Sequence, residues 1–465
     1  LRDQHGLDGV HPDIAALKPL AVLLRRENGL VRPAVLGDEI IAFLPAGVPP
    51  LGLAVDMGTT KLAGYLVDLE SGEALGAAGR MNPQIAYGED VMARIGYAMK
   101  GPSEAKRLQE TFAEGLSELA RELCEGCGRQ TSEILETVIA GNTCMHHLAL
   151  GLPVDQLGLA PYVASLSDAC SVKARTLGWP LAPGASLHFM PNIAGFVGGD
   201  HVAMLLATGL HESRGVTLGL DIGTNTEISL AAGGRLWSCS CASGPAFEGA
   251  HIQDGMRAAD GAVERVSLGD GEPGSPVRVQ TIGGAPPVGV CGSGVLDAVA
   301  EMRRAGVIRE TGAFVPGSHA RLRGRGKEAA FLLVAEGEQG APRDIVITRK
   351  DVNEIQLAKA AIRAGIEELL LAAGLHTPSI DRVVVVGAFG TYLDVESALA
   401  LGMFPPLPPD RFIQVGNAAG IGARMALLSR RCREEAADLA RRVRYVELTS
   451  IPHFALSYAD ALMLP

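Results

Sequence analysis

Two short stretches of the sequence combine an aspartate, a glycine and hydroxyl side chains at the same spacing. They are VDMGTTK at residues 55–61 and LDIGTNTE at residues 220–227. The matching positions are Asp56 and Asp221, Gly58 and Gly223, and Thr59 and Thr224. A glycine lets neighbouring backbone N–H groups converge, and concave turns of this kind bind anions such as phosphate. The repeated pattern therefore predicts a polyphosphate site that uses both stretches.

The aspartate of each stretch follows an apolar strand and faces the same turn. We predict that Asp56 and Asp221 hold Mg²⁺ through its water ligands and position water, since Mg²⁺ beside phosphates usually keeps several waters. The expected phosphate donors are Gly58, Thr59, Thr60, Gly223, Thr224 and Asn225, with Lys61 as a further candidate. The alternative interpretation is two ordinary hairpin turns with capping aspartates, in which Lys61 is a solvated strand residue.

Strands and helices alternate around these turns. Each stretch begins a strand–turn–strand segment that leads into a third strand. Helices are expected at 103–123, with Ser103 as N-cap, at 351–373 and at 431–442. The apolar run RVVVVGAFG starts at residue 382 and suits a strand that is buried on both faces.

The chain is expected to divide into three parts. Residues 1–49 form a small α+β unit, with one helix over 11–28 and two strands around a GDE turn. Residues 50–212 and 213–465 form two similar α/β lobes, the second carrying the C-terminal tail. Ligands of paired α/β lobes usually bind in the cleft between them, so this cleft is the expected nucleotide site.

Composition excludes several classes of function. The net charge of −11 and the pI of about 5.5 argue against non-specific nucleic-acid binding, which needs a basic surface. No apolar run reaches the length of a membrane span. The eight cysteines are scattered, as expected of a reduced cytoplasmic protein. The only C-x-x-C pair, Cys124 and Cys127, lacks the second pair that a zinc or iron–sulfur site needs.

Several motifs together resemble a known family. VDMGTTK, LDIGTNTE and VVVVGAFG are similar to the two phosphate motifs and the adenosine motif of the acetate kinase, sugar kinase, heat-shock chaperone and actin superfamily. GNTCMHHLALG, PNIAGFVGGD, GPAFEGA, VCGSGVLD, QLAKAAIRAGI and VGNAAGIGARMAL resemble the ATP-dependent reductive activators of corrinoid proteins. The resemblance extends from about residue 50 to the end of the chain.

This resemblance implies ATP binding between two ribonuclease-H-like lobes, usually in a homodimer. It also implies a corrinoid protein as partner, whose inactive Co(II) is reduced to Co(I) in methyltransferase and O-demethylase systems. Family members generally carry a ferredoxin-like domain with a 2Fe–2S cluster at the N-terminus. No four-cysteine motif precedes residue 50, so that domain is expected to have been removed or to be supplied by another chain.

Further site residues follow from the same motifs. The backbone at Gly387 and Gly390 is expected to contact adenine or ribose, with Gln356 and Lys359 flanking the adenosine from one helix face. Gly292, Ser293 and Gly294 precede a helix whose N–H groups suit a phosphate. Glu248 is a candidate general base, and Asp200 a polar wall of the cleft. The alternatives are packing turns and helix caps.

Two other functions fit the superfamily. A small-molecule kinase needs a general base beside the transferred phosphoryl group, and no base was convincing. A chaperone-like or actin-like nucleotide switch needs a peptide-binding domain or a polymer interface, and no additional β domain of about 100 residues follows the core.

Overall fold

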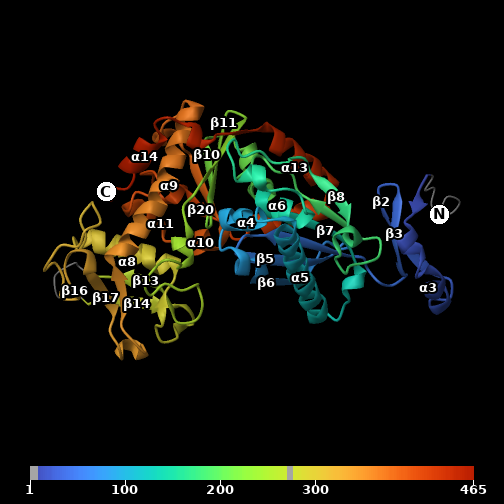
Figure 1. Cartoon of the computed structure of the whole chain (residues 1–465), viewed down its shortest axis with the longest axis horizontal. Helices are drawn as coiled ribbons and strands as arrows, with labels where there is room; N and C mark the ends of the chain where they lie inside the picture. Colours follow the sequence, from blue (N-terminus) through green and yellow to red (C-terminus); the bar gives the residue numbers. More distant parts are fainter. Residues whose placement is uncertain (1–8, 270–275) are drawn as a thin grey trace. The chain divides into compact units, whose positions relative to one another are not determined.

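The computed structural model describes residues 9–269 and 276–465, and it contains two compact units. The first unit comprises the residues up to Gly209 together with Ala418–Val443. The second comprises Leu210–Asn417 and Arg444–Pro465. Each unit is built around a six-stranded mixed sheet (Figure 1). These sheets confirm the expected α/β fold with two similar lobes.

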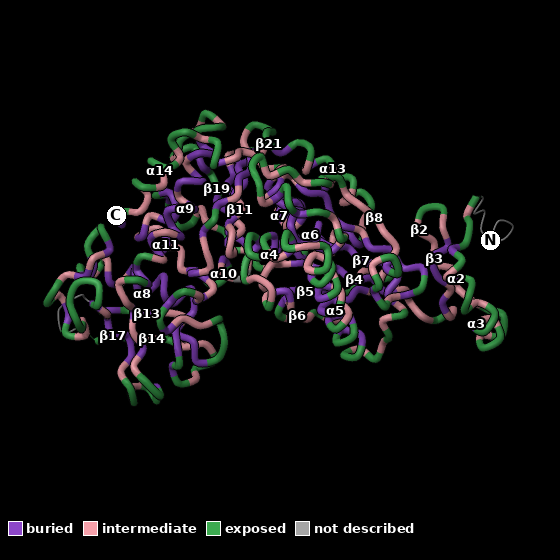
Figure 2. The backbone as a smooth tube through the Cα atoms, in the orientation of Figure 1, coloured by how far each residue is buried: buried purple, intermediate pink, exposed green. Residues whose placement is uncertain are grey.

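The sheet of the first unit has the strand order β6-β5-β4-β7-β9-β8. The strands are β4 (Leu51–Met57), β5 (Lys61–Asp68), β6 (Ala74–Met81), β7 (Ile134–Gly141), β8 (Cys170–Lys173) and β9 (Ser186–Phe189). β4 is antiparallel to β5 and parallel to β7. Every residue of β7 is buried, and so is every residue of β4 except Asp56 (Figure 2). The carboxylate of Asp56 thus ends a strand that is otherwise part of the core.

Helices cover both faces of this sheet. They are α4 (Val91–Ala98), α5 (Pro102–Gly126), α6 (Thr143–Leu150), α7 (Gly199–Thr208), α12 (Ala418–Leu428) and α13 (Arg430–Arg442). α5 packs against β5, where Leu119 approaches Gly64, and α12 packs against β4, where Leu427 approaches Gly52. Side chains alternate along a strand, so Asp56 lies on the same face as Gly52, the face that α12 covers.

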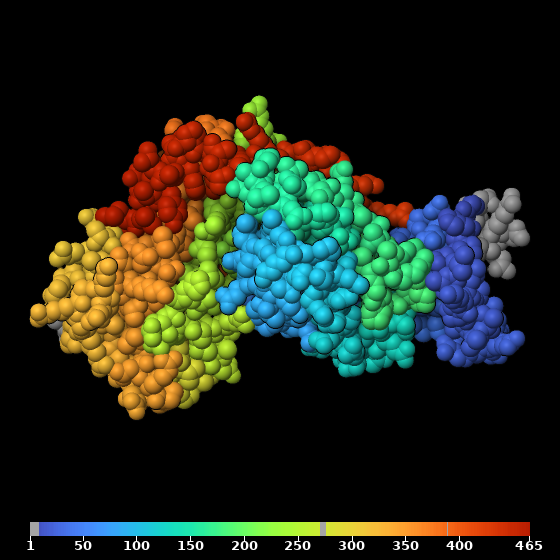
Figure 3. Space-filling model, in the orientation of Figure 1, coloured from blue at the N-terminus to red at the C-terminus, as the bar shows by residue number. Residues whose placement is uncertain are grey.

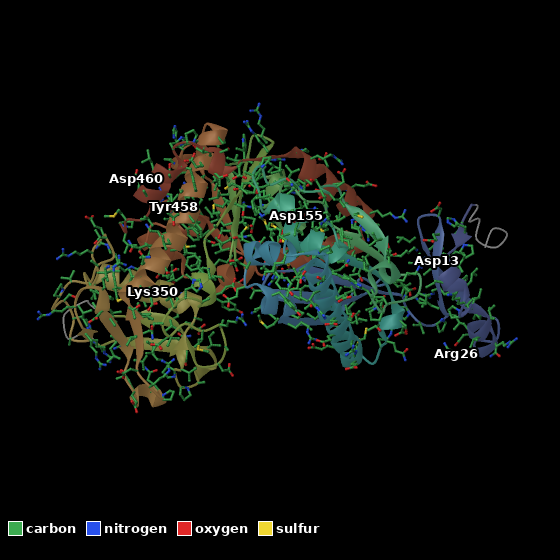
Figure 4. The ribbon with its side chains drawn as sticks, viewed as in Figure 1. Asp13, Arg26, Asp155, Lys350, Tyr458 and Asp460 are labelled. Atoms are coloured by element: carbon green, nitrogen blue, oxygen red, sulfur yellow. The ribbon has the colours of Figure 1, made fainter. Side chains whose placement is uncertain are left out.

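Residues 9–49 form a small sheet with two short helices. The elements are β1 (His11–Pro12), α2 (Ile14–Leu17), α3 (Leu20–Arg26), β2 (Val31–Leu36) and β3 (Glu39–Pro45). Figure 3 shows this segment in dark blue against the rest of the first unit. Asp13, labelled in Figure 4, receives a hydrogen bond of 2.6 Å from Arg175, and Lys173 forms an ion pair with Glu39.

The sheet of the second unit has the strand order β20-β19-β10-β11-β12-β21. The strands are β10 (Thr217–Ile222), β11 (Thr226–Ala232), β12 (Arg235–Cys241), β19 (Arg382–Val386), β20 (Phe412–Gln414) and β21 (Val443–Tyr445). β10 is antiparallel to β11 and parallel to β19, as β4 is to β5 and β7. The repeated motif therefore occupies the same position in both sheets.

The second unit also contains two small sheets, β14-β13-β15 and β16-β17-β18. Their strands are β13 (Ala262–Ser267), β14 (Arg278–Thr281), β15 (Gly289–Val290), β16 (Leu322–Arg323), β17 (Ala330–Val334) and β18 (Ile345–Thr348). The helices of this unit are α8 (Gly292–Arg304), α9 (Arg349–Ala373), α10 (Gly387–Tyr392), α11 (Val395–Ala400) and α14 (Phe454–Asp460). α9 packs across β11 and β12, where Gly365 lies against the thiol of Cys241.

Two local expectations differ from the structure. The helix expected over 11–28 is interrupted at Pro19, because a proline inside a helix removes a hydrogen bond and clashes with the preceding turn. Ser103 is not the N-cap of α5: Gly101 is, Pro102 takes the first helical position, and Ser103 Oγ donates to Glu104. The sequence also predicts a hairpin around GDGEPGSP at residues 269–276, and its turn lies outside the described residues.

The compact units differ from the expected domains in two places, because the small segment up to residue 49 is part of the first unit and so are α12 and α13. The sequence placed everything after residue 213 in the second lobe, but α12 and α13 pack with the first unit. The apolar face of α12 covers β4 and β7, so burial and not chain order determines where this helix belongs.

The cysteines and the helices add two simple facts. All eight cysteines lie in the described residues and are free thiols. Cys124 is buried on α5 and Cys127 is the C-cap of that helix. Across residues 9–269 and 276–465, no helix combines the length and apolar character that crossing a membrane requires.

Candidate nucleotide-binding loops

The first phosphate loop, defined as residues 58–60, connects β4 to β5. All three carbonyl oxygens of this loop accept hydrogen bonds from the body of the first unit. The side-chain Nδ2 of Asn82 donates to Gly58 O, and the backbone N–H of Asn82 donates to Thr60 O, each at 2.9 Å. Arg94 Nη2 donates to Thr59 O at 2.6 Å. The carbonyl groups are therefore fixed toward the protein interior.

The fixed carbonyl groups determine where the loop's N–H groups point. In a trans peptide the C=O and the following N–H point in opposite directions. The N–H groups of Thr59 and Thr60 thus point away from the interior, and neither donates a hydrogen bond to any other part of the described chain. Two outward N–H groups are what a phosphate-binding turn requires.

The remaining side chains of the first loop are partly placed. Asn142 Nδ2 donates to Thr59 Oγ1 at 2.9 Å, and Asn142 Oδ1 caps α6 by accepting from Met145 N. Thr59 is half-buried, whereas Lys61 is exposed at the start of β5. The hydroxyl of Thr59 is thus held by a helix cap, while the ammonium of Lys61 is surrounded by solvent.

The second phosphate loop, residues 223–225, connects β10 to β11 and is held differently. Ser243 Oγ lies within hydrogen-bonding distance of Gly223 O at 3.3 Å and of Thr224 O at 3.4 Å. The Gly223 amide donates to Asn225 O at 3.1 Å inside the turn. A neutral hydroxyl therefore serves here in place of the asparagine and arginine of the first loop.

Glu248 lies next to the second loop. It is the last residue of a short 3-10 helix, η6 (Pro245–Glu248), and its Oε1 accepts a hydrogen bond from Thr224 Oγ1. The structure thus brings the candidate base into contact with a predicted phosphate donor, although 24 residues separate them in sequence.

Asp221 and Gly387 lie side by side at the ends of parallel strands. Asp221 pairs with Val386 across β10 and β19, so Gly387 comes directly after the paired residue. A Cβ atom on Gly387 would lie only 3.0 Å from Asp221 Oδ1, and the φ of Gly387 is +90°. The glycine leaves space beside a half-buried carboxylate, and this arrangement fits a hydrated Mg²⁺.

The glycines at the start of α8 are explained by packing. A Cβ atom on Gly292 would lie 1.9 Å from Phe247 O, and one on Gly294 would lie 2.0 Å from Val263 O. Ser293 is buried, with its hydroxyl 3.3 Å from Cys291 Sγ. Close backbone approach is therefore sufficient to account for these glycines, and phosphate binding by α8 stays a prediction.

An aromatic stack links η6 to α10. The rings of Phe247 and Phe389 are stacked, with centroids 4.6 Å apart and planes inclined by 17°. A Cβ atom on Gly390, the next residue, would lie 2.9 Å from Val385 Cγ1, so this glycine also has a packing requirement. Glu248 follows Phe247 directly in η6, and Gly387 is the first residue of α10, the helix that contains Phe389. The stacked rings therefore keep Glu248 and Gly387 in the same region of the second unit.

Gln356 and Lys359 have a different partner from the expected adenosine. Gln356 Nε2 donates to Leu462 O at 2.8 Å, and Lys359 Nζ donates to Met463 O. Both side chains are buried, and desolvation lowers the pKa of Lys359 to about 8. The tail continues from α14, which packs along α9, as the labelled Tyr458 shows in Figure 4. These two residues thus hold the C-terminal tail.

Sequence reasoning missed the residues that support the loops. Arg94, Asn82 and Ser243 precede or follow the motifs by many residues, and nothing in their local pattern connects them to a turn. Asn142 had a signal, since it follows Gly141 directly after a buried strand, and asparagine is favoured in turns and helix caps. Asp200, the expected cleft wall, lies in the first turn of α7, where its Oδ1 accepts from His201 N.

Comparison with known proteins found two family models and several relatives that match this chain. Residues 51–213 match the RACo middle region, and residues 215–465 match the C-terminal domain of RACo, the ASKHA domain. The corrinoid activation enzyme RamQ of Eubacterium limosum is 37% identical over 462 residues, which are 96% of this chain and 76% of that protein. A Co(II) methylated amine-specific corrinoid protein reductase of Methanosarcina barkeri is 26% identical, covering 84% of this chain and 72% of that protein.

A solved structure agrees over the whole chain. A reductive activator for corrinoid,iron-sulfur protein has a TM-score of 0.89 and 38% sequence identity, and the match covers 100% of this chain and 74% of that one. The family models, the relatives and this structure are consistent with one another. The chain therefore belongs to the RACo family of reductive activators of corrinoid proteins.

Proposed function

We propose that this chain activates a corrinoid protein by promoting reduction of its Co(II) to Co(I) at the expense of ATP. The corrinoid chemistry is supported by the relatives, which are named as a corrinoid activation enzyme, a corrinoid protein reductase and a reductive activator. The step takes up one electron and breaks no bond in this chain. A low-potential donor of the iron–sulfur ferredoxin class is expected to supply that electron.

The observation that supports ATP binding is the duplicated loop, whose first copy has all its carbonyl groups fixed inward. The outward N–H groups of Thr59 and Thr60 bind phosphate oxygens, and Thr224 and Asn225 do the same from the second loop. Asp56 and Asp221 would hold Mg²⁺, which neutralises charge on the phosphates. Glu248 orients or deprotonates the attacking water, which carboxylates do in general base catalysis.

Nucleotide binding is coupled to reduction through a conformational equilibrium. A ligand shifts such an equilibrium only as far as its affinities for the two conformations differ. We propose that ATP favours a conformation in which the cobalt of the bound partner is more easily reduced, and that ATP hydrolysis releases the partner. The homodimer expected from the family is part of this proposal, and light scattering during gel filtration tests it.

The test measures both halves of the reaction. Phosphate release from ATP is followed with and without a Co(II) corrinoid protein, and Co(I) is followed by its absorption with titanium(III) citrate as reductant. We expect the corrinoid protein to stimulate ATP turnover and ATP to increase Co(I) formation. Corrinoid-independent phosphoryl transfer to a sugar or to acetate would instead favour the kinase alternative, and Co(I) formation unaffected by ATP would contradict the coupling.

A further inference from the structure

We propose that Arg94 is a positioning residue for phosphate binding: it fixes the Thr59 carbonyl and places a buried positive charge behind the first phosphate loop. The inference rests on the proposed function, since it concerns how the ATP phosphates are held. Arg94 lies in α4, outside both phosphate motifs.

Arg94 is completely buried, with an exposed fraction of 0%. Its guanidinium donates to Thr59 O at 2.6 Å, to Gly88 O at 2.9 Å, to Met145 Sδ at 3.0 Å and to Gln84 Oε1 at 3.3 Å. All four acceptors are neutral. Within the described residues, no carboxylate forms an ion pair with this guanidinium, although a buried charge is normally paired.

The surroundings compensate that charge only in part, through the carboxylate of Asp90, which raises the pKa of Arg94. Burial lowers the pKa of Arg94 to about 10, so the guanidinium stays protonated at neutral pH. Burial also raises the pKa of the nearby Cys144 to about 12, so that thiol is neutral. Asp90 is the other ionisable neighbour, and its carboxylate caps α4 by accepting from Ala93 N at 2.7 Å.

The Thr59 peptide unit transmits this charge to the outer side of the loop. A cation on the carbonyl oxygen polarises the peptide, so the Thr60 N–H on its other side becomes a stronger donor. A phosphate there would be a further counter-ion for this guanidinium, separated from it by the Thr59 peptide unit. Among the residues that the structure describes, only the Ser243 hydroxyl contacts the carbonyl groups of Gly223 and Thr224 in the second loop, so the effect belongs to the first loop.

A purely structural function of Arg94 makes a different prediction. Arg94 also ties α4 to Gly88 and Gln84, and losing those bonds would destabilise the unit without regard to the ligand's charge. The two interpretations separate when ligands with and without phosphates are compared. Adenosine, ADP, ATP and inorganic tripolyphosphate form such a series.

The experiment uses calorimetric titration of wild type, Arg94→Met and Arg94→Lys with each ligand in the presence of Mg²⁺. Arg433→Met is the matched control, because Arg433 is a mostly buried arginine of the same unit that binds Glu136 and the Ala426 carbonyl and no loop residue. Thermal unfolding is measured for all variants at the same pH.

We expect Arg94→Met to weaken ATP and tripolyphosphate binding by about 10- to 100-fold, since charged hydrogen bonds are the strong ones. Adenosine binding should stay within twofold, and Arg94→Lys should lose less than the methionine variant. If Arg94→Met does not fold, the same selective loss for phosphate ligands is required of Arg94→Lys.

An equal loss for adenosine and ATP, or no loss in either variant, would overturn the inference. The same holds if Arg433→Met reproduces the phosphate-selective loss. A wild-type protein that binds no ATP would instead remove the proposed function, so the two failures can be told apart.

Discussion

The hydroxyl of Thr224 donates a hydrogen bond to Oε1 of Glu248, which joins the second phosphate loop to η6. This contact connects a predicted phosphate donor with the only candidate base. It also constrains the carboxylate, because Phe247, the preceding residue, is stacked on Phe389. The second phosphate loop, η6 and α10 are therefore connected to one another within the second unit.

The first prediction concerns Glu248 as a base. Glu248→Gln keeps the size of the side chain and an acceptor for Thr224 but removes the basic oxygen. ATP turnover should fall by about 100-fold or more, as is usual when a general base is lost, with the KM for ATP nearly unchanged. Phosphate release measured over a range of ATP concentrations gives both parameters.

Glu264→Gln is the control for this prediction, because Glu264 accepts from Gln280 on the β13–β14 hairpin, outside the loop. Thr224→Val removes the hydroxyl that donates to Glu248 but leaves the carboxylate in place. This variant therefore separates the positioning of Glu248 from its action as a base. If Glu248→Gln kept wild-type turnover, water activation would have to come from another group.

The second prediction concerns Asp221. Asp221→Asn should abolish Mg²⁺-dependent ATP hydrolysis while the fold stays intact, since the residue is half-buried at the end of β10. The reason is that an amide is a much poorer ligand for a hydrated Mg²⁺ than a carboxylate. Turnover is measured during a Mg²⁺ titration, and circular dichroism reports on the fold.

Asp68→Asn serves as the matched substitution, because Asp68 also ends a strand but caps the turn at Glu70 and Ser71. It should leave the Mg²⁺ dependence unchanged. Near-normal hydrolysis by Asp221→Asn would count against the site.

The third prediction concerns the space beside Asp221. Gly387→Ala adds a Cβ atom 3.0 Å from Asp221 Oδ1 at a φ of +90°. The substitution should cost about 1–2 kcal/mol of unfolding free energy from backbone strain. It should also abolish Mg²⁺-dependent ATP binding by crowding the carboxylate, which titration calorimetry measures.

Gly374→Ala carries a comparable backbone cost without the crowding. Gly374 has a φ of +69°, and a Cβ atom there would meet no atom within 4 Å. Equal ATP affinities in the two alanine variants would show that the space beside Asp221 is not needed.

The fourth prediction concerns acid stability of the first unit. Burial, together with the neighbouring His147, lowers the pKa of His146 to about 3. In the unfolded chain a histidine titrates near 6.5, so the unfolded state binds more protons below that pH. The unfolding free energy must then fall as the pH drops from about 6.5, by about 2 kcal/mol at pH 5 from this residue alone.

His146→Leu should remove that share of the pH dependence. Urea unfolding at pH 7.5 and pH 5 is followed through Trp179, which packs on Phe189 beside His146, in a Trp237→Phe background. His376→Leu, at an exposed position, is the control. An unchanged difference between the two pH values in His146→Leu would contradict the prediction.

The sequence predicted the elements of the site because strand–turn–strand patterns are local. Apolar alternation and Gly-containing turns determine β4, β5, β10 and β11 within a few residues of each motif. The same locality accounts for the errors: Pro19 interrupts a helix that periodicity favoured, and Pro102 places the start of α5 before Ser103. In both cases a proline overrode the helix pattern of the neighbouring residues and determined where the helix begins.

The partners of the predicted residues could not be obtained in this way. Gln356 and Lys359 have the spacing of a ligand-binding helix face, yet their side chains bind carbonyls of the tail about 100 residues later. Ser243, which holds the second loop, lies 20 residues beyond it. Such contacts depend on how the sheet and helices pack, and periodicity contains no information about packing partners.

What the sequence determined by itself is the duplicated acidic glycine turn, the two α/β lobes and the family, because each is written in contiguous residues. Only the tertiary structure decided that α12 packs with the first unit, that Glu248 meets Thr224, and that a fully buried Arg94 fixes the Thr59 carbonyl. The physical reason is that burial and hydrogen-bond saturation are properties of the packed chain, and they bring together residues that no local pattern connects.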